Sequence, residues 1–136
     1  MIIGRILAWG NVHPKKLFQI DGLGAMLSAV LLGIVLVRLE SVFGIPKPTL
    51  YLLASLPILF AIYDFYCYFL IDKNIGTYLK GIAIANLTYC GLSMALTIHH
   101  RKEITSLGWI YLLTEIALVG VLVFVELSVT KNQSVN

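Results

Sequence analysis

The sequence predicts an all-α protein, an antiparallel four-helix transmembrane bundle, and three observations predict it. Of the 136 residues, 59% are hydrophobic and only 12% are charged, whereas a soluble domain has about 45–50% apolar and about 25% charged residues. The apolar residues form four runs of about 20 residues, the length that crosses a bilayer core. Short segments rich in polar residues, glycine or proline separate these runs, so consecutive helices are expected to be antiparallel neighbours.

This composition excludes several classes of protein. A chain this short keeps a large share of its surface exposed. It therefore cannot hide this many apolar residues inside a water-soluble fold. A soluble enzyme, a nucleic-acid-binding protein and a disordered chain are therefore excluded as first interpretations. The net charge is +3, and in a membrane protein basic residues act as topology signals. We expect the lipid bilayer as partner, and no nucleic acid.

The first part of the chain, residues 1–16, holds an apolar stretch that is too short to span a membrane. We interpret it as a segment lying in the membrane interface, anchored by Trp9. No small-residue cleavage site precedes the first long apolar run, so we do not expect a removed signal peptide.

The transmembrane domain is predicted over residues 17–130, followed by a polar tail, 131–136, that is expected to fray. None of its apolar runs alternates in polarity, so each is read as a helix. A helix also satisfies its own backbone hydrogen bonds in lipid. The predicted spans are residues 17–37, 50–71, 79–98 and 104–125.

Basic residues on the two sides of the membrane give the orientation. Six lie on the side of the termini and the second loop, and four lie in the first and third loops. This excess places both termini in the cytoplasm by the positive-inside rule. The six are Arg5, Lys15, Lys16, Lys73, Lys80 and Lys131, and the four are Arg38, Lys47, Arg101 and Lys102.

Each predicted span carries one strongly polar residue: Asp21, Asp64, Asn86 or Glu115. A carboxylate at the centre of a bilayer costs about 2.5–3.5 kcal/mol on the mildest scale, so such residues face the bundle interior. At 1.5 Å per residue, Asp64 and Asn86 lie roughly 12–13 Å from the same membrane edge, and Asp21 roughly 6–9 Å from it. Three of the four therefore share one half of the bilayer, and Glu115 lies near the middle of its helix.

Helical spacing extends each polar position into a stripe, because residues three, four and seven apart share a face. Tyr89 lies on the face of Asn86, and Tyr111 on that of Glu115. Glu126 also shares the face of Glu115, but it lies at the predicted membrane edge, where we expect it to be solvated.

No cation lies within the predicted membrane core. Lys80 is the nearest, and its long side chain could reach towards Asp21 or Asp64. A carboxyl group buried without a cation is favoured in its neutral form. Such a group suits a proton carrier or a cation site, and it equally suits a hydrogen-bonding clamp between helices.

The sequence predicts no metal site, no cofactor and no catalytic residue. His99 and His100 are adjacent, so on a helix they point about 100° apart, and His13 lies on the opposite side of the membrane. No phosphate-binding loop, nucleophile elbow, zinc-protease motif or dinucleotide fingerprint occurs. A membrane enzyme acting on a lipid or quinone is therefore the last of our alternatives.

Three segments of the sequence resemble a group of small bacterial four-helix integral membrane proteins that have no assigned activity. The segments are residues 18–25 (FQIDGLGA), 43–46 (FGIP) and 84–90 (IANLTYC). The resemblance extends over about residues 17–130, and the first 16 residues depart from it. It implies the four-helix fold and a bacterial inner membrane, and it implies no activity. Small multidrug transporters also have four helices and an acidic residue in the first, but the residues around Asp21 do not match theirs.

The leading functional hypothesis is an ion- or proton-linked channel or transporter element. Its rival is a structural or assembly subunit of a membrane complex, in which the buried polar residues only clamp helices together. Four helices enclose little space, so a transport path would need a homo-oligomer or another partner. The candidate residues for binding a proton or monovalent cation are Asp64, Glu115, Asp21, Asn86 and Tyr89.

Overall fold

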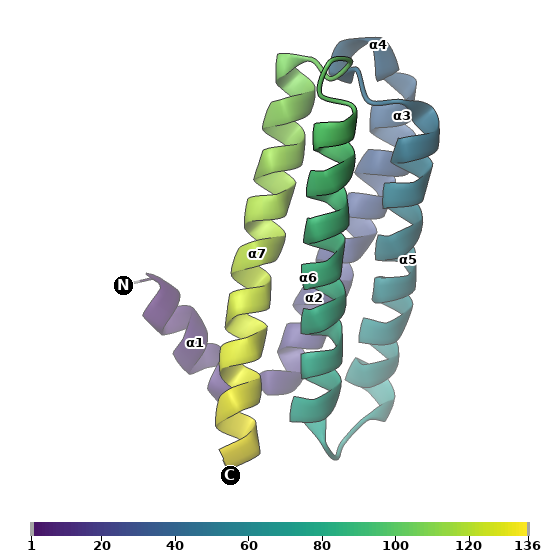
Figure 1. Ribbon diagram of the computed structural model, residues 1–136. Helices are drawn as coiled ribbons and strands as arrows, with labels where there is room; N and C mark the ends of the chain where they lie inside the picture. Colours follow the sequence, from purple (N-terminus) through teal and green to yellow (C-terminus); the bar gives the residue numbers. More distant parts are fainter. Residues whose placement is uncertain (1, 136) are drawn as a thin grey trace.

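The computed structural model of this chain describes residues 2–135, and those residues form helices joined by short turns (Figure 1). No strand occurs within the described range, which confirms the all-α prediction. The elements are α1 (Ile2–Val12), α2 (Pro14–Val30), a π-helix η1 (Leu31–Val35), α3 (Leu36–Arg38), α4 (Glu40–Phe43), α5 (Lys47–Leu70), α6 (Ile75–His99) and α7 (Ser106–Val135).

Four helical segments are long and apolar enough to cross a membrane. The first, Pro14–Arg38, combines α2, η1 and α3, and the next two are α5 and α6. The fourth is the part of α7 that ends at Lys131. These segments have 24 to 26 residues each, which is ample for a bilayer core of about 30 Å.

The helices extend beyond the predicted spans at most of their ends. Both α2 and α5 begin with a proline in the first turn, where the missing N–H costs no hydrogen bond. Helix α7 continues to Val135 through the predicted polar tail, and no glycine or proline interrupts it after Gly120. Asn136, the end of that predicted tail, lies outside the described residues.

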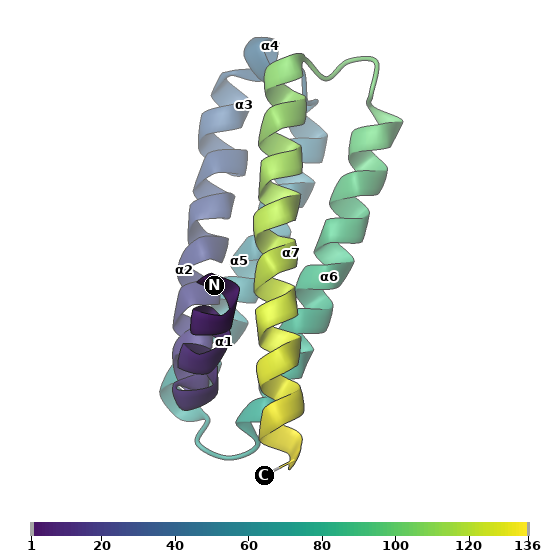
Figure 2. The ribbon, with the colours of Figure 1, turned by 90° about the vertical axis from the view of Figure 1, so that its left-hand side faces the viewer.

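The long helices form two hairpins, with α2 packed mainly along α5 and α6 mainly along α7. Figures 1 and 2 show the hairpins side by side, with consecutive long helices joined at alternating ends. Gly22 allows the close approach of α2 and α5, because a Cβ atom there would lie 3.1 Å from the Phe65 ring.

The short helix α1 turns back against the outside of α7 (Figures 1 and 2). Gly10 makes this possible, because a Cβ atom there would already lie 3.0 Å from Val129. The predicted N-terminal segment is therefore helical and packed on the bundle, and its position in the membrane interface stays a prediction.

The end of the bundle near α4 is closed by backbone contacts between the two hairpins. Gly44 follows α4 with a φ of 72°, a left-handed conformation that glycine adopts at no steric cost. The hydroxyl of Thr105 donates to the Val42 carbonyl (2.6 Å) and accepts from Gly108 N–H (3.2 Å). Thr105 thereby caps α7 and joins it to the first hairpin.

The buried apolar residues form two clusters, one near each end of the bundle. The α4-end cluster consists of Leu32, Leu36, Ile45, Leu50, Leu53, Ala54, Tyr89, Ile104 and Leu112. The α1-end cluster consists of Leu17, Phe18, Cys67, Leu79, Ile82, Val125 and Val129. Asn86 and Glu115 lie along the helices between these clusters, whereas the buried threonines Thr49, Thr97 and Thr130 lie towards the ends of the bundle.

The outward surface of the four long helices is apolar along most of its length. Large hydrophobic side chains are exposed on every one of these helices. A soluble protein of this size rarely exposes a continuous apolar surface of this extent. The exposed residues include Leu23, Leu27, Val30, Ile58, Leu59, Ile62, Phe69, Ile84, Leu87, Ile110, Leu118, Val121 and Phe124.

Two glycines of α7 provide a matched test of the packing at the α4 end. A Cβ atom at Gly108 would collide with the Phe43 carbonyl oxygen, whereas one at Gly120 would meet nothing within 4 Å. We expect Gly108→Ala to lower the stability by about 1–3 kcal/mol and Gly120→Ala to change it by less than about 1 kcal/mol. Thermal unfolding of both variants in detergent measures the difference, and equal midpoints would contradict the packing described here.

Candidate functional site

Four of the seven acidic side chains in the chain are buried. They are Asp21, Asp64, Glu115 and Glu126, and two of them, Asp64 and Glu126, are completely shielded, with 0% exposure. No lysine or arginine is buried anywhere in the described range. The interior therefore contains several acidic groups and no basic side chain to balance them.

The first group of buried polar residues, which we term the carboxyl cluster, consists of Asp21, Asp64, Asn86 and Glu126. All four long helices contribute to it, one residue each. The Asn86 amide Nδ2 donates to Asp21 Oδ1 (2.9 Å) and, over a longer distance, to Glu126 Oε1 (3.4 Å). One amide thus links α6 to both α2 and α7.

Asp64 is the least satisfied member of the carboxyl cluster. Neither of its carboxyl oxygens accepts a hydrogen bond from an N–H or hydroxyl donor, and it lies beside the Asp21 carboxyl, with which it can share a proton. The carboxyl groups of Asp21 and Glu126 lie close enough to interact with it electrostatically. Three carboxyl groups this close cannot all be ionised in a low-dielectric interior without a compensating cation. At least one of them must therefore hold a proton or pair with a cation.

The second group, which we term the tyrosine–glutamate pair, consists of Tyr89 on α6 and Glu115 on α7. The Tyr89 hydroxyl donates to Glu115 Oε1, and Tyr111 lies close enough to Glu115 to interact with it. The other oxygen of Glu115, Oε2, has no hydrogen-bond partner. The pair therefore joins α6 to α7 and still leaves one acceptor free.

Basic side chains stay at the ends of the bundle. Lys15 pairs with Asp72 at 2.9 Å, and His100 lies 3.6 Å from Glu103. Lys80 is exposed and lines a separate surface hollow beside Thr77. The expectation that Lys80 could reach Asp21 or Asp64 is therefore wrong, because its side chain is directed to the surface of the bundle.

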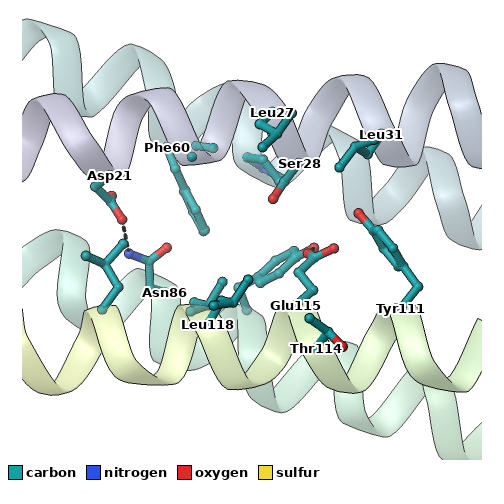
Figure 3. Close-up of a pocket in the computed structure, with 16 residues that line it drawn as sticks. Asp21, Leu27, Ser28, Leu31, Phe60, Asn86, Tyr111, Thr114, Glu115 and Leu118 are labelled. Atoms are coloured by element: carbon teal, nitrogen blue, oxygen red, sulfur yellow. Dashed lines mark hydrogen bonds between the residues drawn. The ribbon is translucent and has the colours of Figure 1, made fainter. Parts of the chain in front are cut away.

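A cavity of about 330 Å³ lies between the two hairpins, and both polar groups face it. Asp21 and Asn86 line one part of it, and Tyr89 and Glu115 line another. Figure 3 shows the Asp21–Asn86 hydrogen bond and, further along the helices, Glu115 directed into the space that separates α7 from α2. The rest of the lining is mostly apolar: Gly24, Ala25, Leu27, Ser28, Leu31, Pro57, Phe60, Tyr111, Thr114, Leu118, Val119 and Leu122.

The cavity is open towards the outside of the bundle between α2 and α7. Leu27 on α2 and Leu118 on α7 both line it, although they are 61% and 68% exposed. Gly24 and Thr114 are also exposed lining residues. These two helices pack mainly against α5 and α6 and hardly against each other, which leaves the gap between them.

The structure brings together only some of the sequence-predicted candidates. Asp21, Asn86 and Asp64 meet in the carboxyl cluster, whereas Glu115 pairs with Tyr89 elsewhere along the bundle. Asp64 and Glu115, which we expected to act as the titrating groups, therefore belong to different groups. Asp64 also does not line the cavity that the other four candidates share.

The expectation that Glu126 is solvated is wrong. Its side chain is fully buried and accepts a hydrogen bond from Asn86. The predicted span ended at residue 125, but α7 continues to Val135, so Glu126 lies well inside the helix. Its spacing of eleven residues from Glu115, about three helical turns, correctly placed it on the same face, and only the assumed end of the span led to the wrong expectation.

A metal ion in a protein is held by several ligand side chains grouped around one point. Within residues 2–135, no three histidine, cysteine, aspartate or glutamate side chains are grouped so that they could hold one. Cys67 and Cys90 are free thiols, and the Cys90 thiol lies 3.8 Å from the Ile116 carbonyl.

Asn86 provides a test of the carboxyl cluster, because it is the donor to both Asp21 and Glu126. We expect Asn86→Leu, which keeps a similar volume, to lower stability by about 1–2 kcal/mol, since two buried acceptors lose their partner. The control is Thr88→Val on the exposed face of α6. Thermal unfolding in detergent measures both, and an Asn86→Leu variant as stable as the parent would contradict the role assigned to the amide.

Comparison with known proteins identifies no relative: no family model matches the chain, and neither does any curated protein or solved structure. The function is therefore inferred from the residues of the chain itself.

Proposed function

We propose that the chain is a multi-pass membrane protein, an antiparallel four-helix transmembrane bundle with a polar interior. Two observations support this arrangement: the four long apolar helices and the reversal of polarity between exterior and interior. Leucine, isoleucine, valine and phenylalanine side chains cover the outside, while carboxyl and amide groups are buried. Lipid would solvate the apolar side chains on the outside, and the helices shield the buried polar groups from that lipid.

The membrane is proposed to be the bacterial inner membrane, with both termini in the cytoplasm. The choice of membrane follows only from the resemblance of residues 18–25, 43–46 and 84–90 to small bacterial four-helix membrane proteins, a resemblance that no matching family model or curated protein supports. The excess of basic residues on the side of the termini, six against four, supports the orientation.

The proposed activity is the uptake and release of protons by buried carboxyl groups, as part of a proton-linked transporter element. The observation that carries it is Asp64, which is 0% exposed and lies beside the carboxyl groups of Asp21 and Glu126, with no buried basic side chain among the described residues to balance them. Intramembrane carboxyl groups that lack a cation characteristically serve proton relays and ion pathways. The absence of a metal-binding group among the described residues favours protons over a coordinated cation.

An alternating transporter element fits the structure better than an open channel. The α4-end cluster and the α1-end cluster fill the two ends of the bundle with apolar side chains, and many of these, such as Phe18 and Leu50, are 0% exposed. Water therefore has no continuous polar path along the described helices in this conformation. Proton exchange would require the hairpins to move relative to each other or a second copy to complete a path.

The alternative is a structural or assembly subunit of a membrane complex, and the Asn86 hydrogen bonds favour it. They link α6 to α2 and α7, as clamps between helices do. A proton shared between Asp64 and Asp21 would likewise link α5 to α2, but a clamp does not require that proton to exchange. The two proposals therefore differ most clearly in what they expect of Asp64.

Proton flux into liposomes that contain the purified protein tests the proposal. We expect Asp64→Asn to reduce the flux to the level of protein-free liposomes, because the amide keeps the shape of the side chain but cannot exchange a proton. Glu115→Gln is expected to impair the flux as well. The matched control is Asp72→Asn, since the Asp72 side chain is 86% exposed outside the spans, and this variant is expected to keep the flux.

Sodium and potassium fluxes are measured on the same liposomes. An Asp64-dependent alkali-cation flux without proton flux would replace the proton with a monovalent cation. If the parent carries no ion and Asp64→Asn is as stable as the parent, the transport proposal fails and the assembly subunit remains.

A further inference from the structure

We propose that the cavity between α2 and α7 binds a small apolar amine, with the ammonium group of the ligand at Glu115. The inference assigns a ligand class to the same interior in which proton exchange is proposed. It therefore rests on that proposed function. The ligand is defined by its chemistry alone: an apolar body of modest size that carries one protonated amine.

The size and lining of the cavity fit such a molecule. Its volume of about 330 Å³ lies at the lower end of the range of small-molecule sites, roughly 300–1,000 Å³. Leucines, Phe60 and Pro57 form most of its wall, which suits an apolar body. The acidic groups lie at two parts of the wall, Asp21 beside Asn86 at one and Glu115 beside Tyr89 at the other. A few polar groups in a mostly apolar wall are typical of ligand sites.

Two carboxyl oxygens of the cavity are left without a hydrogen-bond donor, although the cavity is also lined by the hydroxyl-bearing residues Ser28, Tyr111 and Thr114. Of these, Tyr111 lies close to Glu115. Glu115 Oε2 and Asp21 Oδ2 are both buried and have no hydrogen-bond partner, and both residues line the cavity. The Tyr89 hydroxyl and the Asn86 amide already donate to the other oxygens of these carboxyl groups. A ligand that supplies N–H donors and a positive charge satisfies this arrangement, whereas an acidic ligand would add a further uncompensated charge.

The route into the cavity also selects an apolar ligand. Its opening lies between the exposed side chains of Leu27 and Leu118, on the apolar flank of the bundle. The two apolar clusters close the ends. A molecule that reaches Glu115 through this opening must first dissolve in the surrounding lipid, which an apolar amine does in its neutral form.

Amine binding and proton binding exclude each other at Glu115. The amine leaves its own proton in the water when it enters the lipid, and in the cavity it takes the proton of the Glu115 carboxyl group, so that an ammonium–carboxylate pair forms. One proton is thus released to the water for each ammonium ion that binds to a protonated Glu115. Raising the proton concentration is therefore expected to weaken amine binding. This competition would couple the binding and release of the amine to the proposed uptake and release of protons.

The probe is radiolabelled phenylbutylamine, with uncharged phenylbutanol as its isostere. Binding is measured by equilibrium dialysis against phosphatidylcholine bilayer discs that hold the purified protein, and protein-free discs give the background from lipid partitioning. We expect saturable binding of the amine, weakened about tenfold or more by Glu115→Gln because the charge-assisted hydrogen bond is lost. Binding of the alcohol is expected to be weaker than that of the amine and insensitive to this substitution.

A pair of glycine variants tests the location of the site. A Cβ atom at Gly24 or at Gly91 would meet nothing within 4 Å, so a side chain can leave the backbone at both positions. Gly24 lines the cavity and Gly91 does not. We expect Gly24→Leu to abolish saturable amine binding and Gly91→Leu to leave it unchanged, with both variants as stable as the parent.

Three results would overturn the inference: no saturable amine binding to the parent, equal binding to Gly24→Leu, or equal affinity for the alcohol. Proton flux is measured on the same preparation of protein. It shows whether only the amine-binding inference fails or the proposed proton-linked function fails as well. If the parent conducts protons in an Asp64-dependent way but binds no amine, only the ligand assignment fails. If neither activity is present, the proton-linked function fails with it.

Discussion

The burial of four carboxyl groups without a basic partner is the constraint on which the rest of the structure depends. The outer surface of the helices is apolar, so these groups cannot reach water by turning outwards. They are instead enclosed between helices, where Asn86 and Tyr89 provide hydrogen bonds to Asp21, Glu126 and Glu115. These donors leave several carboxyl oxygens unsatisfied, and the interior therefore demands a proton or a cationic ligand.

The two-hairpin architecture explains how the interior can hold both a tight polar cluster and a cavity. Glycine contacts draw α2 against α5, while α2 and α7 stay apart and leave an opening to the outside. The apolar clusters lie towards the two ends of the bundle, on either side of this interior. Exchange with the interior is thus easiest from the flank of the bundle, where an apolar solvent is expected.

The helices could be predicted because apolar runs of membrane-spanning length are a strong signal, and the spacing rule placed Tyr89 beside Asn86 on the cavity face. The position of Glu126 was missed because span ends are set by an assumed length, whereas α7 continues to Val135. The pairing of Tyr89 with Glu115, the π-helical turn η1 and the gap between α2 and α7 depend on helix rotation and packing. Short-range patterns in one sequence do not determine these.

The central claim is that carboxyl groups in the interior hold exchangeable protons at neutral pH. Infrared spectroscopy of the protein in lipid measures this directly, because a protonated carboxyl group has a carbonyl stretch distinct from that of a carboxylate. We expect a protonated-carboxyl band that shifts when heavy water replaces water, and that loses intensity in Asp64→Asn but not in Asp72→Asn. Spectra that contain only carboxylate bands, unchanged by Asp64→Asn, would contradict the account.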